Sequence, residues 1–119
     1  LGRIEIDLSS SALLRVWWSA YWHWSGLGYP DPSQFLALDN MATVRFKVTI
    51  DGIEVARIHK SPSLRGHDCG LCVGSLAVDS GPHVIEVTAK QFYPNGASTP
   101  TATFCTVKSR DLTMWARRQ

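Results

Sequence analysis

The segment from Ser11 to Trp24 reads Ser-Ala-Leu-Leu-Arg-Val-Trp-Trp-Ser-Ala-Tyr-Trp-His-Trp and holds four of the five tryptophans of the chain. Every second residue from Leu14 to Trp22 is apolar, whereas the intervening row mixes polar, charged and aromatic side chains. A period of two is typical of a β-strand with one face in a core and the other partly wetted. A helix would spread the same residues over all of its sides. The segment therefore predicts a long strand at the centre of a β-rich core.

Further short segments show the same alternation or strand-like composition. They span residues 4–8, 43–50, 71–78, 83–92, 103–108 and 112–116, and another begins at residue 53. Their inward-facing residues are predicted to be Ile4, Ile6, Leu8, Val44, Phe46, Val48, Ile50, Leu76, Val78, Ile85, Val87 and Ala89. About eight short strands separated by turns favour a two-sheet sandwich over a parallel βαβ fold.

Asp51-Gly52 separates two apolar-alternating segments and predicts a β-hairpin with a type I′ turn, because that turn needs positive φ at both central residues. A two-residue turn would pair Ile50 with Ile53 and Val48 with Val55. Both pairs match apolar with apolar on one face, as cross-strand partners should.

The fold class expected is all-β: an antiparallel sandwich of seven or eight strands, of jelly-roll or immunoglobulin-like type. Residues 1–119 are expected to form one domain. The chain begins at Leu1 rather than Met, which suggests a processed product or part of a longer chain. Asp31-Pro32 fits a helix start, so one short helix at 32–38 is the most helix we expect. Residues 61–70 are predicted to be a loop.

The composition argues against several classes of function. Basic and acidic residues nearly balance, at twelve to ten, and form no basic stripe of the kind that nucleic-acid binders show. No apolar run approaches the ~20 residues that span a bilayer. The four histidines are scattered and accompany no catalytic motif. We therefore expect no enzyme activity, no cofactor, no nucleic-acid partner and no membrane segment.

The sharpest local pattern is His67-Asp-Cys69-Gly-Leu-Cys72. These three residues could be zinc ligands, with Cys105 or His83 as the fourth, but a second compact ligand pair is missing. The other interpretations are reduced, partly buried cysteines, or a disulfide between Cys105 and Cys69 or Cys72. A metal site is thus only the weaker alternative.

An aromatic row is the main candidate for function. If the other row of the central strand faces the core, Trp17, Tyr21, His23 and Trp24 are candidates for its outer surface, and Trp115 could join them. Such a row could fill a subunit interface or stack on sugar rings. A flanking loop within residues 25–42 could also cover it.

The order of the motifs along residues 12–117 resembles a known kind of module. The motifs are Leu-Leu-Arg-Val-Trp-Trp-Ser-Ala, then Val-Thr-Ile-Asp-Gly-Ile-Glu-Val, then Asp-Ser-Gly-Pro-His-Val-Ile-Glu-Val-Thr-Ala-Lys, and finally Ser-Arg-Asp-Leu-Thr-Met-Trp-Ala-Arg-Arg. This pattern is similar to small β-sandwich domains of tailed-bacteriophage virion proteins: minor tail proteins, head fibres and capsid decoration proteins. The density of tryptophan and the Cys-Gly-Leu-Cys segment depart from it.

The resemblance implies a non-enzymatic virion component, with other virion proteins and further copies of itself as partners. Its aromatic row and its basic C-terminal strand would dock on neighbouring subunits, and contact with a host-surface glycan would be compatible. The alternative is a carbohydrate- or ligand-binding module of a secreted or cell-surface protein.

Overall fold

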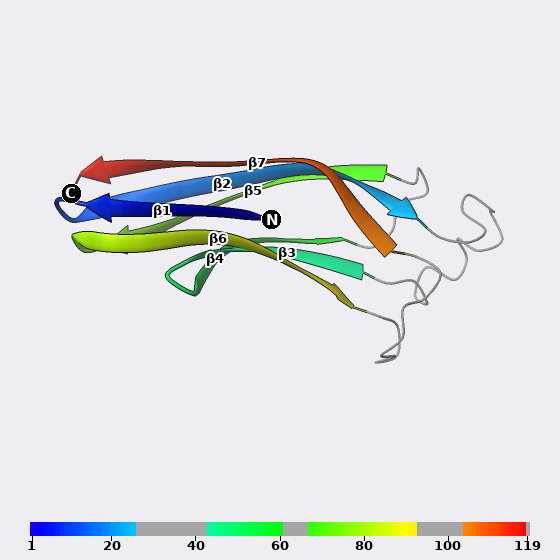
Figure 1. The fold of residues 1–119 in the computed structure, drawn as a ribbon, viewed down its shortest axis with the longest axis horizontal. Helices are drawn as coiled ribbons and strands as arrows, with labels where there is room; N and C mark the ends of the chain where they lie inside the picture. The colour runs from blue at the N-terminus through cyan, green and yellow to red at the C-terminus, as the bar shows by residue number, and fades with distance from the viewer. Residues whose placement is uncertain (26–42, 61–66, 93–103, 119) are drawn as a thin grey trace.

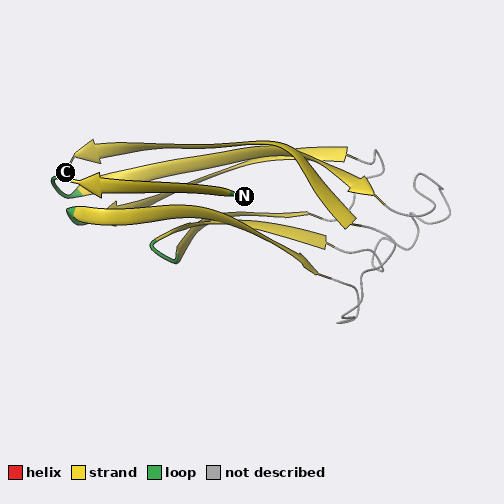
Figure 2. Ribbon diagram, in the orientation of Figure 1, coloured by secondary structure: helices red, strands yellow, loops and turns green. Residues whose placement is uncertain are grey.

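A computed structural model describes residues 1–25, 43–60, 67–92 and 104–118 of the chain. The described part is all-β and contains no helix (Figures 1 and 2). The short helix expected at 32–38 lies outside the described residues. The seven strands are β1 Gly2–Leu8, β2 Ala12–Ser25, β3 Thr43–Ile50, β4 Ile53–Lys60, β5 His67–Val78, β6 Gly81–Phe92 and β7 Phe104–Arg118.

The strands form two antiparallel sheets that lie one above the other, which confirms the sandwich (Figure 1). The strand order is β1-β6-β3-β4 in one sheet and β5-β2-β7 in the other. Because β1 and β2 belong to different sheets, the order differs from that of immunoglobulin domains, whose first two strands share a sheet. The strands run along the long axis of a slab of 56 × 25 × 17 Å, so each sheet presents a long outer face.

The core is built from the apolar rows that the sequence predicts. Leu14, Val16, Trp18 and Trp22 of β2 are fully buried, and Phe46 of β3 meets both tryptophans from the opposite sheet. Its ring centroid lies 4.8 Å from that of Trp18 and 5.0 Å from that of Trp22. Within the described residues, neither indole N–H has a hydrogen-bond partner. The further core residues expected from alternation are buried or pack on the core: Ile4, Ile6, Leu8, Val44, Val48, Ile50, Leu76, Val78, Ile85 and Val87.

The Asp51-Gly52 hairpin is confirmed, with φ of 51° and 82° at its two central residues. Ile50 pairs with Ile53 as predicted, but the predicted pairing of Val48 with Val55 is wrong, because Val48 pairs with Ala56. Val55 is an extra residue in β4, a β-bulge, which bends a strand locally.

The Val55 bulge lies against the other sheet. A Cβ added to Gly74 of β5 would lie only 2.2 Å from the Val55 carbonyl oxygen. The two backbones can therefore approach this closely only because residue 74 has no side chain. This contact joins the β4 edge of one sheet to the β5 edge of the other.

Three other expectations are wrong. The segments 103–108 and 112–116 form one continuous strand, β7, which has a β-bulge at Lys108 (the strand bends visibly in Figure 1). Strand β5 begins at His67, so part of the expected 61–70 loop pairs with β2 instead. Ala89 pairs with Phe46 but is exposed, and it lies beyond Val87, where the pairing of β6 with β1 ends.

The side chains of Asp51 and His83 connect the hairpin turn to β6, and we call this pair the Asp51–His83 clasp. The Asp51 carboxylate accepts hydrogen bonds from His83 Nδ1 at 2.6 Å and from the Val84 backbone N–H at 2.9 Å. His83 Nε2 donates to the Asp79 carbonyl at 2.7 Å. Both ring nitrogens face acceptors, an arrangement that favours the doubly protonated imidazole. The hydrogen bond to Asp51 raises the pKa of His83, and the bond from His83 lowers the pKa of Asp51.

Candidate functional site

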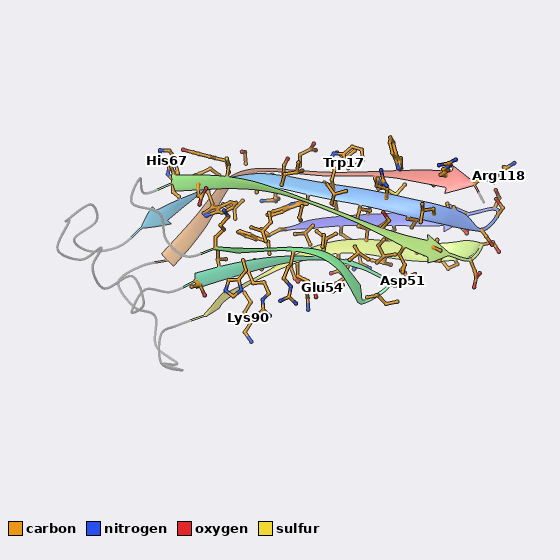
Figure 3. The ribbon with its side chains drawn as sticks, turned by 180° about the vertical axis from the view of Figure 1, so that it is seen from behind. Trp17, Asp51, Glu54, His67, Lys90 and Arg118 are labelled. Carbon is orange, nitrogen blue, oxygen red and sulfur yellow. The ribbon has the colours of Figure 1, made fainter. Side chains whose placement is uncertain are left out.

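The candidate site is the outer face of the sheet β5-β2-β7. Strand β2 lies in the middle, and its outward row runs from Leu13 to His23 in steps of two residues. We call the outward residues of β2 and their register partners on β5 and β7 the aromatic face. Figure 3 shows Trp17 projecting from this sheet, away from the other layer.

Two tryptophans meet near one end of the aromatic face, where β7 pairs with β2. Trp115 lies opposite Arg15 in the register, one step diagonally from Trp17. The two indole rings have centroids 5.5 Å apart and planes at 87°, so the edge of one meets the face of the other. The Arg15 guanidinium lies 5.9 Å from the Trp115 ring centroid, within the range of a cation–π contact. The sequence expectation that Trp115 joins the surface of Trp17 is thus confirmed.

A second cluster lies further along the same face. Tyr21 Oη and His23 Nε2 are joined by a hydrogen bond of 2.8 Å. His67 at the start of β5 pairs with His23, and its ring centroid lies 5.8 Å from that of Tyr21. Trp24 follows on β2 and pairs with Cys105, but the side chains of both lie outside the described part.

Between the two clusters the aromatic face carries exposed aliphatic side chains. Leu71 and Val73 of β5 are 62% and 53% exposed, and Trp115 is 53% exposed. A shallow depression of about 520 Å³ lies beside Leu71. Its lining also includes Ser19, Tyr21, Cys69 and Asp111. Leu71 and Val73 were not among the residues predicted for this surface. Alternation could have found them, because residues two apart on a strand share a face and Leu76 was already assigned to the opposite one.

The outer face of the four-stranded sheet carries charged side chains where the aromatic face carries aromatic and aliphatic ones. Its exposed side chains include charged groups that pair with one another: Arg3 with Glu5 at 2.8 Å and with Glu86 at 3.2 Å, and Arg57 with Glu54 at 2.7 Å. We call this the charged face. Exposed ion pairs of this type contribute little to stability but keep a surface solvated. Figure 3 shows Glu54 on the layer opposite Trp17.

The predicted metal ligands do not converge. His67 and Cys69 point outward on β5, whereas Cys72 lies three residues on and is buried in the core. Both thiols are free, and burial raises the pKa of Cys72. Among the described residues no group of three or more histidine, cysteine or acidic side chains could hold a metal ion. The Cys105 side chain lies outside them.

Comparison with known proteins gives no relative: no protein-family model matches the chain, and no curated protein matches it. Within the described ranges, no helix has the length and apolar character needed to cross a membrane.

Proposed function

We propose that this protein is a non-enzymatic structural or accessory module whose aromatic face docks on a neighbouring protein subunit. The observation that carries the proposal is the contrast between the two outer faces of one sandwich. Several acids and bases of the charged face pair with one another, as on a solvated surface. The aromatic face exposes Leu71, Val73 and Trp115 on neighbouring strands. An exposed apolar surface of this type marks an interaction site more often than a free surface.

The energetics favour a partner that covers these side chains. Complete burial of a leucine or valine side chain contributes ~1.5–3 kcal/mol. Because Leu71 and Val73 are still more than half exposed, covering them would contribute about 1 kcal/mol each. Tryptophan is among the residues most enriched at the energetic centres of protein interfaces. Trp17 and Arg15 already hold the Trp115 ring in place, so little side-chain freedom is lost on docking.

The similarity of the motif order to β-sandwich domains of tailed-phage virion proteins supports a more specific proposal. The protein would be a capsid decoration, head-fibre or minor tail component, located in the virion. Its partners would be other virion proteins and further copies of this chain. The long outer faces of the slab suit a role in which one face meets a neighbour and the other meets solvent.

A carbohydrate-binding module of a secreted or cell-surface protein is the second candidate. The depression beside Tyr21 favours it, because hydroxyl and carboxylate groups from Ser19, Ser109 and Asp111 line it together with an aromatic ring. The Trp17–Trp115 pair favours the first candidate. Sugar rings stack on flat aromatic surfaces, and two indoles at 87° do not form one.

Sedimentation equilibrium tests the proposal over a protein concentration range of about 1–500 µM, which covers dissociation constants typical of transient interfaces. We expect the wild-type chain to self-associate. Replacing both Trp17 and Trp115 by alanine is expected to weaken association by ~30-fold or more, as loss of a central tryptophan does. A wild-type chain that stays monomeric and binds neutral oligosaccharides through the same two residues would contradict the proposal and favour the second candidate.

A further inference from the structure

A second depression of about 420 Å³ lies at the end of the aromatic face, where β7 finishes. Its lining includes Leu13 and Arg15 of β2 and Trp115 and Arg117 of β7. In the register Arg15 pairs with Trp115, and Leu13 pairs with Arg117. The two arginines therefore sit on one face at diagonal positions, where long side chains can reach the same group.

These two arginines have no carboxylate partner among the described residues. Neither arginine belongs to the ion pairs seen between described residues on the other sheet, such as those of Arg3, Arg57 and His83. Asp111 is the acid of the aromatic face, and it pairs with Ser19 in the register and accepts a hydrogen bond from Thr113. Ser19 lies four residues from Arg15, a separation of about 13 Å along the strand. Because that distance exceeds the Debye length at physiological salt, ~8 Å, the attraction between Asp111 and Arg15 is largely screened.

The lining of the depression combines two cationic side chains with apolar ones. Trp115 is 53% exposed, and its ring is fixed by the edge-to-face contact with Trp17 and by the guanidinium of Arg15. Leu13 adds an aliphatic side chain. A ligand that fits has a carboxylate for the guanidinium groups, which can bind it through two parallel hydrogen bonds, and an adjoining apolar group for the indole.

We propose that this depression binds an aspartate or glutamate side chain, next to an apolar residue, on the protein partner that docks on the aromatic face. The inference rests on the proposed docking function and adds the chemistry of the partner. Charge complementarity selects the occupant, since neither arginine of the site has a carboxylate partner among the described residues, and Asp111 is the one acid among the described residues of the docking face. Such pairing at an interface sets register and specificity. A protein segment is favoured over an acidic sugar, because Arg15 covers one face of the Trp115 ring.

The test uses two acetylated pentapeptides, Gly-Phe-Glu-Leu-Gly and its matched form with glutamine in place of glutamate. Binding is followed through the indole N–H resonance of Trp115, which the Trp115→Phe variant assigns. We expect the glutamate peptide to shift this resonance saturably and to bind at least ~5-fold more tightly than the glutamine peptide. Arg15→Glu and Arg117→Glu should each weaken its binding by ~10-fold or more. Lys60→Glu, the same change of charge on β4 of the other sheet, should not.

Three results would overturn the inference. The first is equal binding of the two peptides. The second is no shift of the Trp115 resonance with either peptide up to about 5 mM, since weaker binding than this carries no specificity. The third is a shift with an oligogalacturonide but not with the glutamate peptide, which would identify an acidic sugar as the ligand. If face variants abolish self-association while the two peptides bind equally, the docking function stands and only the acid preference fails. If the peptides are discriminated but face variants leave assembly unchanged, the docking function fails instead.

Discussion

The Asp51–His83 clasp offers a quantitative test of how the hairpin is held to β6. Replacing Asp51 with asparagine keeps a residue that tolerates the left-handed turn and keeps an oxygen for the Val84 N–H. It removes the carboxylate that accepts from His83. A hydrogen bond to a charged group contributes ~1.5–3 kcal/mol and a neutral one ~0.5–1.5 kcal/mol. The Asp51 side chain is 39% exposed, so solvent screening places the difference at the lower end, about 1 kcal/mol.

The pH dependence follows from the directions of the two pKa shifts. The pKa of Asp51 is lowered from 3.8, so its stabilising effect is present above pH 3.8 and is lost as the pH falls through the depressed value. The pKa of His83 is raised from 6.5, so its effect is complete below pH 6.5 and is lost as the pH rises through the elevated value. The clasp should therefore stabilise the fold most between pH 3.8 and 6.5.

Denaturant unfolding followed by tryptophan fluorescence measures this effect. We expect Asp51→Asn to lower the free energy of unfolding by about 1 kcal/mol near pH 5, and the gap to shrink as the pH rises through the elevated pKa of His83. The same substitution at exposed Asp7 is the control and should change stability by less than ~0.5 kcal/mol. If Asp51→Asn and wild type unfold together near pH 5, or if their gap is the same at all pH values, the charged clasp does not exist as described.

Three further predictions concern the core and the sheet contacts. Gly74→Ala should cost about 3 kcal/mol, because its Cβ would meet the carbonyl oxygen of the β4 bulge. Gly70→Ala should cost less, about 1 kcal/mol, because its Cβ would meet side-chain atoms of Ile58 and Trp22 rather than backbone. Equal costs in denaturant unfolding would refute the close approach of Gly74 to Val55. Trp22→Phe should cost much less than the ~3–5 kcal/mol of Trp22→Ala, since it also removes a buried N–H that has no partner; equal losses of stability would contradict this. In the native protein, alkylation followed by mass measurement should find Cys69 modified and Cys72 intact until unfolding, and equal rates would show that Cys72 is not buried.

Much of the fold follows from local sequence, because a period of two fixes which side chains of a strand enter the core. The buried row of β2 and the Asp51-Gly52 turn are of this kind. The bulge at Val55 is not, since it depends on the approach of Gly74 from the other sheet. The continuity of β7 across Lys108 likewise depends on pairing with β2. Assignment of strands to sheets is equally non-local.

In the candidate site, too, some features follow from local sequence and others depend on the pairing of distant strands. Alternation placed Trp17, Tyr21 and His23 on one outer row, and the structure gives them half-buried positions there. The contact of Trp115 with Trp17 requires the register between β2 and β7, which no short segment encodes. The separation of Cys69 from Cys72 was available from the period of two, since residues three apart on a strand point to opposite faces.

The central claim is that the aromatic face meets a protein partner. Val73 and Ile53 make a matched pair for testing it, since both are aliphatic and β-branched and are 53% and 54% exposed. Val73 lies on the aromatic face, whereas Ile53 pairs with the buried Ile50 at the hairpin end of the other sheet, away from that face. Sedimentation equilibrium should show that Val73→Ser weakens self-association by about 5-fold, from the loss of about 1 kcal/mol of burial, whereas Ile53→Ser leaves it unchanged. Equal association constants for the two variants, or a loss only with Ile53→Ser, would contradict the claim.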